Sequence, residues 1–234
     1  MEQLRTGPAA GLSRAAWLSL GLLFSRPCLA CQGRVADPRE AGLCPACWGG
    51  LSAWPLPAVV PHLGEAPDFE AMAAFAYEGW LRELVHEWKF GGRSALTRPL
   101  ARQMAGRLRG LGAGAYDAVI ALPPNPVSLR ERGFDAGGDL AAAAAKELGL
   151  PLLRPLAQLR PRQKQSGLKR EDRLQNALGL YAAKDPSGIL QGRRLLIIDD
   201  LLSTGATAQA AAAALLQAGA LEIGVGVLAH AVGN

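Results

Sequence analysis

Two adjacent carboxylates followed by hydroxyl side chains around a glycine form the most distinctive chemical pattern in this 234-residue chain. Asp199 and Asp200 come directly after the apolar residues 195–198 and shortly before Ser203, Thr204, Gly205, Ala206 and Thr207. Carboxylates accept hydrogen bonds from vicinal hydroxyl groups, while hydroxyls, a glycine backbone and a helix N-terminus bind phosphate. The pattern therefore predicts a site for a phosphorylated sugar, with ribose hydroxyls on the two Asp residues and a 5′-phosphate on residues 203–207.

The flanking sequence supplies the elements that would position these groups. Residues 195–198 have the length and branching of a buried parallel strand, and the alanine-rich residues 208–218, closed by Gly219, favour a helix. The resulting turn would aim the positive end of the helix dipole at the phosphate. It is neither a P-loop nor a G-x-G-x-x-G turn. In the alternative interpretation, the two Asp residues only cap the helix and the glycine only turns the chain.

Strand and helix patterns alternate along most of the chain. Residues 117–122 and 221–229 are predicted strands, and residues 139–148, which stop at Gly149, are a predicted helix. Another helix is predicted by an apolar stripe at helical spacing, made up of Tyr77, Trp80, Leu81, Leu84, Val85 and Trp88. This order predicts an α/β fold with a parallel sheet flanked by helices.

Two arginines follow the first of these strands. Arg130 and Arg132 come after residues 117–122, at the carboxyl end, where open α/β sheets bind their ligands. We expect them to offer countercharge to a diphosphate. The alternative is a solvated loop in which they pair with Glu131.

A second basic segment, residues 160–173, contains Lys164 and Lys169 and has no hydrophobic period. Such a stretch predicts a long polar loop. It could close over a pyrophosphate or bind the phosphates of a nucleic acid, and the sequence supports both interpretations equally.

All four cysteines fall in two C-x-x-C pairs, Cys28 with Cys31 and Cys44 with Cys47. Four thiolates at this spacing fit one tetrahedral zinc ion without an open position, which predicts a structural Zn²⁺ site. A redox-active disulfide is the weaker alternative, because no βαβ pattern surrounds these residues. Thiolate-bound zinc indicates a reducing, cytoplasmic compartment.

The chain is long enough for one α/β domain and a small appendage. We predict a helix and zinc-binding module over residues 1–54, a proline-rich linker over 55–68 and the main domain over 69–234. Residues 12–24 have the spacing of an amphipathic helix, with a secretory signal as the alternative and no membrane span. The net charge of +5 and the pI near 9.3 favour an anionic partner, either a phosphorylated metabolite or a nucleic acid.

Taken together, the ordered motifs resemble the ComF (competence protein F) family, also represented by GntX, and the resemblance covers nearly the whole chain. The segment 199–207 is by itself similar to the signature of type I phosphoribosyltransferases. The other motifs that carry the resemblance are the four cysteines, residues 77–82, residues 88–92, residues 132–134, and Gln165 with Arg173 and Asn176.

The resemblance implies a type I phosphoribosyltransferase-like sheet with an N-terminal zinc module, and binding of phosphoribosyl pyrophosphate (PRPP) with Mg²⁺. It also implies a role in natural transformation, the uptake of single-stranded DNA, with a DNA-uptake helicase and competence proteins as partners. The alternative is an active phosphoribosyltransferase of nucleotide or cofactor metabolism with an unknown acceptor. Ser203 stands where purine transferases often carry an Asp, which argues against purine salvage.

Overall fold

The computed structural model describes residues 26–35, 42–54, 58–60, 69–159, 179–185 and 187–231. These divide into two compact units, residues 1–49 and residues 50–234. The predicted N-terminal helix at 12–24 and the predicted basic loop at 160–173 lie outside the described residues. None of the helices in the described ranges has the length and apolarity needed to cross a bilayer.

The first unit is small and built around its cysteines. Strands β1 (Arg26–Pro27) and β2 (Arg34–Val35) pair antiparallel, and helix α2 (Pro45–Gly49) begins directly after Cys44 and carries Cys47. Its buried apolar side chains are few, with Leu43 and Trp48 the largest in this part of the structure. A core of this size does not stabilise a fold without a further cross-link.

The second unit is an α/β domain whose six-stranded sheet has the order β3-β4-β10-β9-β5-β6. All neighbouring strands run parallel except the edge strand β3, which pairs antiparallel with β4. The strands are β3 (Ala58–Val60), β4 (Phe69–Ala76), β5 (Ala118–Ala121), β6 (Leu152–Leu153), β9 (Arg194–Leu202) and β10 (Glu222–His230). Continuous apolar runs in β5, β9 and β10 suit strands that are covered on both faces.

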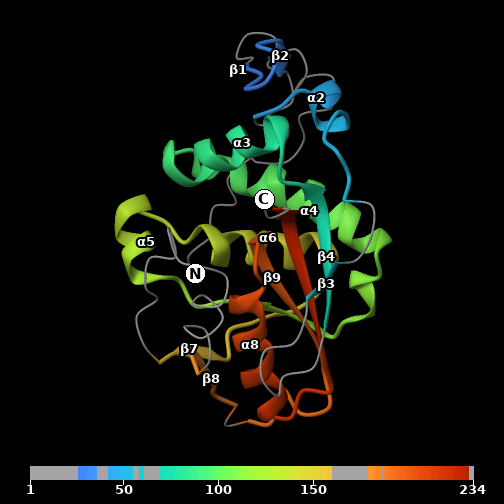
Figure 1. Ribbon diagram of the computed structural model, residues 1–234, viewed down its shortest axis with the longest axis vertical. Helices are drawn as coiled ribbons and strands as arrows, with labels where there is room; N and C mark the ends of the chain where they lie inside the picture. Colours follow the sequence, from blue (N-terminus) through green and yellow to red (C-terminus); the bar gives the residue numbers. More distant parts are fainter. Residues whose placement is uncertain are drawn as a thin grey trace, which may run out of the picture. The chain divides into compact units, whose positions relative to one another are not determined.

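Helices cover the two faces of this sheet (Figure 1). Helix α8 (Ala206–Gln217) packs Ala211 and Leu215 into a core with Ile197 and Val225. The other face carries α4 (Thr97–Gly110) and α6 (Ala136–Leu148), and Leu108 of α4 comes so close that a Cβ on Gly226 would lie 2.7 Å from it. The parallel α/β architecture predicted from the sequence is therefore confirmed.

The remaining elements connect these layers. They are α3 (Gly79–Phe90), α5 (Pro126–Arg132), the 3-10 helices η2 (Ser94–Leu96) and η3 (Ala113–Ala115), and the antiparallel strands β7 (Leu156–Gln158) and β8 (Tyr181–Ala183). The backbone N–H of Leu159 donates to the carbonyl of Leu180, which extends the pairing of β7 and β8 by one residue pair.

Several element boundaries differ from the predicted ones. Arg130 and Arg132 lie in a helix for which no element was predicted, because Asn125 caps α5 by accepting from the N–H of Val127 and proline occupies its first turn. Helix α6 begins at Ala136 instead of residue 139, since Asp135 caps it. Strand β3 lies inside the stretch predicted as a linker.

The predicted apolar stripe on α3 is only partly buried. Leu81, Leu84, Val85 and Trp88 are buried, but Trp80 is 44% exposed and Tyr77 precedes the helix.

Strand order reverses between β5 and β9. The chain leaves β5 for β6 on one side, whereas β9 lies on the other side of β5 and is followed by β10 beyond it. Open α/β sheets bind ligands in the crevice at the carboxyl ends of strands where the order reverses. The topology therefore points to the ends of β5 and β9.

Candidate functional site

A cavity of about 490 Å³ lies at this position. Its walls come from four parts of the chain: Lys89 and Phe90 at the end of α3, most of residues 122–137 after β5, residues 199–208 after the buried half of β9, and Val227 of β10. All seven predicted residues in 199–207 line it, which are Asp199, Asp200, Ser203, Thr204, Gly205, Ala206 and Thr207. The sheet thus gathers groups that are more than one hundred positions apart.

Strand β9 is longer than predicted, and its length shapes the cavity. The predicted strand ended at Ile198, but β9 continues to Leu202 and includes both Asp residues. Strand β5 ends at Ala121, opposite Ile198, whereas β10 pairs with β9 up to Leu202. On the β5 side, residues 199–202 extend beyond the last pair that β5 forms with β9, and this opens the crevice.

The two Asp side chains make different contacts. Asp199 Oδ1 accepts from the backbone N–H of Asp200 at 2.8 Å. Asp200 Oδ2 lies 2.6 Å from Nζ of Lys89, and the two side chains are only 16% and 10% exposed. Successive side chains of a strand leave in different directions, so Asp200 faces Lys89 of α3 while Asp199 leaves the strand on its other side.

The loop after β9 presents backbone donors to the cavity. Gly205 has φ +74°, in the left-handed region that favours glycine, and it immediately precedes α8. Helix α8 has no side-chain cap in the usual geometry; the N–H of Ala206 reaches Thr204 Oγ1 only at 3.5 Å. The N-terminus of α8 thus forms part of the cavity wall, where its backbone amides and its dipole favour an anion.

The predicted basic residues are placed differently from one another. Arg132 lines the cavity, and its guanidinium lies over the ring of Phe90, 4.8 Å from the ring centre. Arg130 is exposed and is not part of the cavity wall. Lys164 and Lys169 lie outside the described residues.

The cavity wall is more acidic than basic over the described residues. Its acidic groups are Glu131, Asp135, Asp199 and Asp200, and its basic groups are Lys89 and Arg132. Four carboxylates against two cations repel a free polyanion. A diphosphate needs added positive charge here, from a divalent cation or from basic residues beyond this wall.

Lys89 is the site residue that the sequence reasoning missed, although its segment was part of the family resemblance. The signal was present in the helical spacing, because Leu81, Val85 and Lys89 recur every four residues on the buried face of α3. Lysine is almost never buried unless it is paired. A lysine within a buried helical stripe therefore marks a site.

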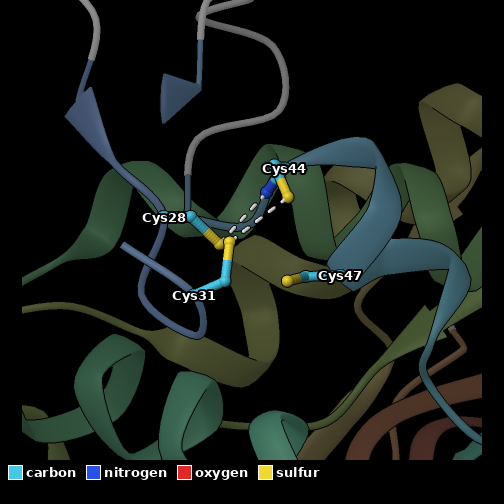
Figure 2. Close-up of side chains that lie close together, drawn as sticks. All are labelled: Cys28, Cys31, Cys44 and Cys47. Carbon is cyan, nitrogen blue, oxygen red and sulfur yellow. Dashed lines mark hydrogen bonds between the residues drawn. The ribbon is translucent and has the colours of Figure 1, made fainter. Parts of the chain in front are cut away.

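The four cysteine side chains of the first unit converge on one point (Figure 2). All four sulfur atoms lie within 4.8 Å of one another, and the Sγ atoms of Cys31 and Cys44 are 3.8 Å apart. Tetrahedral zinc with Zn–S bonds of about 2.3 Å places its sulfurs about 3.8 Å apart. The cysteines are free rather than disulfide-bonded, and the cluster fits a metal with four thiolate ligands.

The electrostatics of the cluster also favour a bound cation. Burial acts to raise the pKa of the Cys28 thiol, but backbone N–H donors, those of Cys31 and Cys44 foremost, lower it to about 6. Burial and the neighbouring sulfurs raise the pKa of Cys47 to about 12. Four thiolates cannot be ionised together without a bound cation, and metal binding would release their protons.

Comparison with known proteins agrees with this architecture. A family model described as a phosphoribosyl transferase domain matches residues 136–232. The chain is 24% identical over 226 residues to "Competence protein F" of Haemophilus influenzae, covering 89% of this chain and 98% of that protein. It is 27% identical over 204 residues to "DNA utilization protein YhgH" of Salmonella typhimurium, covering 85% and 87%.

Two solved structures show weaker similarity. The PRPP amidotransferase of B. subtilis is 22% identical with a TM-score of 0.38, over 56% of this chain and 25% of that one. The UMP synthase of Leishmania donovani is 25% identical with a TM-score of 0.37, over 60% and 24%. The chain thus spans about a quarter of the length of these two solved proteins.

The family model covers α6 through β10, which carry the predicted sugar-phosphate residues, and the curated relatives extend the similarity over most of the chain. The family and the fold class predicted from the sequence are confirmed. These similarities support a ComF-family, phosphoribosyltransferase-like protein.

Proposed function

We propose that this protein binds PRPP together with Mg²⁺ in the cavity, and that it acts in the uptake of single-stranded DNA during natural transformation. One observation carries the proposal of the ligand. Two carboxylates at the open end of β9 and the N-terminus of α8, which lacks a side-chain cap, line the same cavity. These are the groups that ribose hydroxyls and a 5′-phosphate require at the two ends of one sugar.

In the proposed complex, Asp199 and Asp200 accept hydrogen bonds from the ribose hydroxyls. The backbone N–H groups and hydroxyls of residues 203–207 bind the 5′-phosphate. Arg132 lines the cavity as a countercharge for the diphosphate. Arg130, Lys164 and Lys169 remain predicted contributors to that countercharge.

The acidic wall supports a role for Mg²⁺. Among the described residues, the cysteine cluster is the only group of three or more metal-ligating side chains gathered together, so the cavity has no cage of its own for a cation. Mg²⁺ commonly binds to one or two carboxylates together with substrate phosphates. It would be held by Asp199 or Asp200 with the ligand and would neutralise the diphosphate.

We also propose that the metal of the cysteine cluster is Zn²⁺ and that it is structural. Four thiolates favour zinc and leave no open coordination position for chemistry. Free cysteines holding zinc suit a reducing compartment, which supports a cytoplasmic location.

Isothermal titration calorimetry with PRPP and Mg²⁺ tests the ligand. We expect saturable binding by the wild-type protein and a loss of at least about 100-fold in affinity in Asp199→Asn/Asp200→Asn, because charge-assisted hydrogen bonds contribute about 1.5–3 kcal/mol each. Glu83→Gln, which removes one negative charge at an exposed position of α3, is the control for a carboxylate-to-amide change outside the cavity. No binding to the folded wild-type protein would refute the proposal.

The DNA role rests on the relatives named competence protein and DNA utilization protein and on the net charge of +5. A DNA-uptake helicase and other competence proteins are the expected partners. Affinity for single-stranded DNA should fall with salt at a slope of about −0.7 per phosphate contacted, and should be unchanged in Asp199→Asn/Asp200→Asn. Absence of any salt-dependent DNA binding would contradict this part of the proposal.

An active phosphoribosyltransferase is the second candidate, favoured by the apolar rim of the cavity. Phe90, Val127 and Leu129 are exposed apolar side chains that line it, and they offer a surface to an acceptor. No histidine is part of the described wall, so displacement at the anomeric carbon would depend on positioning and electrostatics. Release of pyrophosphate from PRPP in an acceptor screen tests this candidate.

A further inference from the structure

Lys89 is a buried cation in the wall of the cavity. Its side chain is 10% exposed, and its Nζ lies 2.6 Å from Oδ2 of Asp200. Burying an ion pair costs several kcal/mol of desolvation per ion, and apolar side chains in its place are often equally stable or more so. Stability alone is therefore a weak reason for a lysine at this position, and a contact with ligand gives it a function.

The end of α3 is fixed in place. Trp88 is fully buried, and its Nε1–H donates to Oγ1 of Thr97 at 2.9 Å. The ring of Phe134 meets Trp88 edge-on, with ring centres 6.4 Å apart. The backbone that carries Lys89 is thus held between α4 and the segment after β5, so the ammonium is positioned before any ligand binds.

Both cations of the cavity wall are associated with the last two residues of α3. The guanidinium of Arg132 lies over the ring of Phe90, which directly follows Lys89. The first turn of α8 supplies donors of its own for a phosphate. Of the two anionic groups on the proposed ligand, the diphosphate is therefore the one left for the cations at the end of α3.

We propose that Lys89 binds the diphosphate directly while it stays paired with Asp200. An ammonium group has three donors, and the pair with Asp200 uses one of them. Lys89 would neutralise the charge of Asp200 as the diphosphate approaches. It would also link the group that binds the ribose hydroxyls to the group that binds the diphosphate. This inference rests on the proposed binding of PRPP.

The test compares two ligands, PRPP with Mg²⁺ and ribose 5-phosphate, which lacks the diphosphate. In Lys89→Met we expect the affinity for PRPP to fall by about 10- to 100-fold, since a hydrogen bond to a charged group contributes about 1.5–3 kcal/mol. The affinity for ribose 5-phosphate should fall much less. The ratio of the two affinities, which is the preference for PRPP, should therefore fall by at least about 10-fold. Lys89→Arg should recover part of that preference.

Two further variants separate contact from support. Asp200→Asn should lower the affinity for both ligands by a similar factor and keep the preference for PRPP, because Lys89 is still present. Lys146→Met, an exposed change of the same charge on α6, should leave both affinities unchanged. If Lys89→Met does not fold, Lys89→Met/Asp200→Asn removes both charges, and its preference is compared with that of Asp200→Asn.

The outcomes distinguish the two proposals. Wild-type protein that binds neither ligand would refute the proposed function itself. Wild-type binding of both ligands, with equal losses for both in Lys89→Met, would overturn the role of Lys89 in diphosphate binding and leave the PRPP site intact.

Discussion

The cysteine cluster and the ligand cavity are assembled in opposite ways. The cluster takes its four side chains from two pairs within residues 28–47, whereas the cavity collects its wall from α3, from the segment after β5 and from the end of β9. One site is local in sequence and depends on a metal to order a small unit. The other exists only when a parallel sheet has formed around an apolar core. The two sites should therefore be separable by mutation.

The largest difference between the effects on the cysteine cluster and on the cavity is expected from Cys44→Ser/Cys47→Ser. Removing two of four ligands should abolish zinc binding and unfold the first unit, because structural zinc contributes about 10–16 kcal/mol in small zinc-binding peptides. The second unit has its own core, and it should keep its secondary structure and its affinity for PRPP. Metal analysis, limited proteolysis and calorimetry measure the three effects. Loss of the second unit along with the first would break the comparison.

A smaller effect is expected from Gly205→Ala. The left-handed conformation costs a residue with a Cβ about 1–2 kcal/mol, so we expect a Tm lowered by several degrees and weaker binding of ribose 5-phosphate. Gly106→Ala in α4 is the matched control, since a Cβ there meets no atom within 4 Å and the helix interior favours alanine. The cysteine cluster should retain its metal in both variants.

Trp88→Phe should cost about 1 kcal/mol of unfolding free energy or somewhat more. It removes the donor to Thr97 Oγ1 and leaves that buried hydroxyl without this partner, while most of the apolar volume remains. Denaturant unfolding of the second unit measures the change. An unchanged stability together with unchanged PRPP affinity would show that the end of α3 is held by other contacts.

The smallest effect concerns pH. Burial lowers the pKa of His230, whose Nδ1 has no hydrogen-bond partner in the described structure and whose ring meets Trp54 edge-on. As the pH falls, His230 is therefore protonated in the unfolded chain before it is protonated in the folded protein. Its contribution to the free energy of unfolding is complete above about pH 6.5 and decreases below that pH. In His230→Gln, the fall of Tm between pH 8 and pH 5 should be shallower. The cysteine cluster is identical in the wild type and in the variant, so acid affects it equally in both and the difference in Tm reports on His230. Parallel plots of Tm against pH would contradict the lowered pKa of His230.

The same contrast explains how far the sequence could predict the structure. The cysteine spacing sufficed for the cluster, because all ligands are near one another along the chain. Residues 199–207 were found for the same reason, since a strand, two carboxylates and a phosphate-sized loop are consecutive. The alternation of strand and helix gave the parallel sheet, which the structure and the family match confirm.

What the sequence missed depends on pairing between distant segments. The continuation of β9 to Leu202 is stabilised by β10, a strand that starts twenty positions later. The ion pair of Lys89 with Asp200 joins residues 111 positions apart, and no local pattern of either segment predicts it. Arg130 and Arg132 were both predicted to offer countercharge to a diphosphate, but Asn125 caps a helix over this segment, α5, and Arg130 lies outside the cavity wall.

The central claim is that one cavity holds both ends of a phosphoribosyl diphosphate. A crystal structure of the protein grown with PRPP and Mg²⁺ tests it most directly. The account predicts the 5′-phosphate against the first turn of α8, the ribose hydroxyls on Asp199 and Asp200, and the diphosphate facing Arg132. Density for the ligand elsewhere, or its absence from this cavity at saturating concentration, would contradict the account.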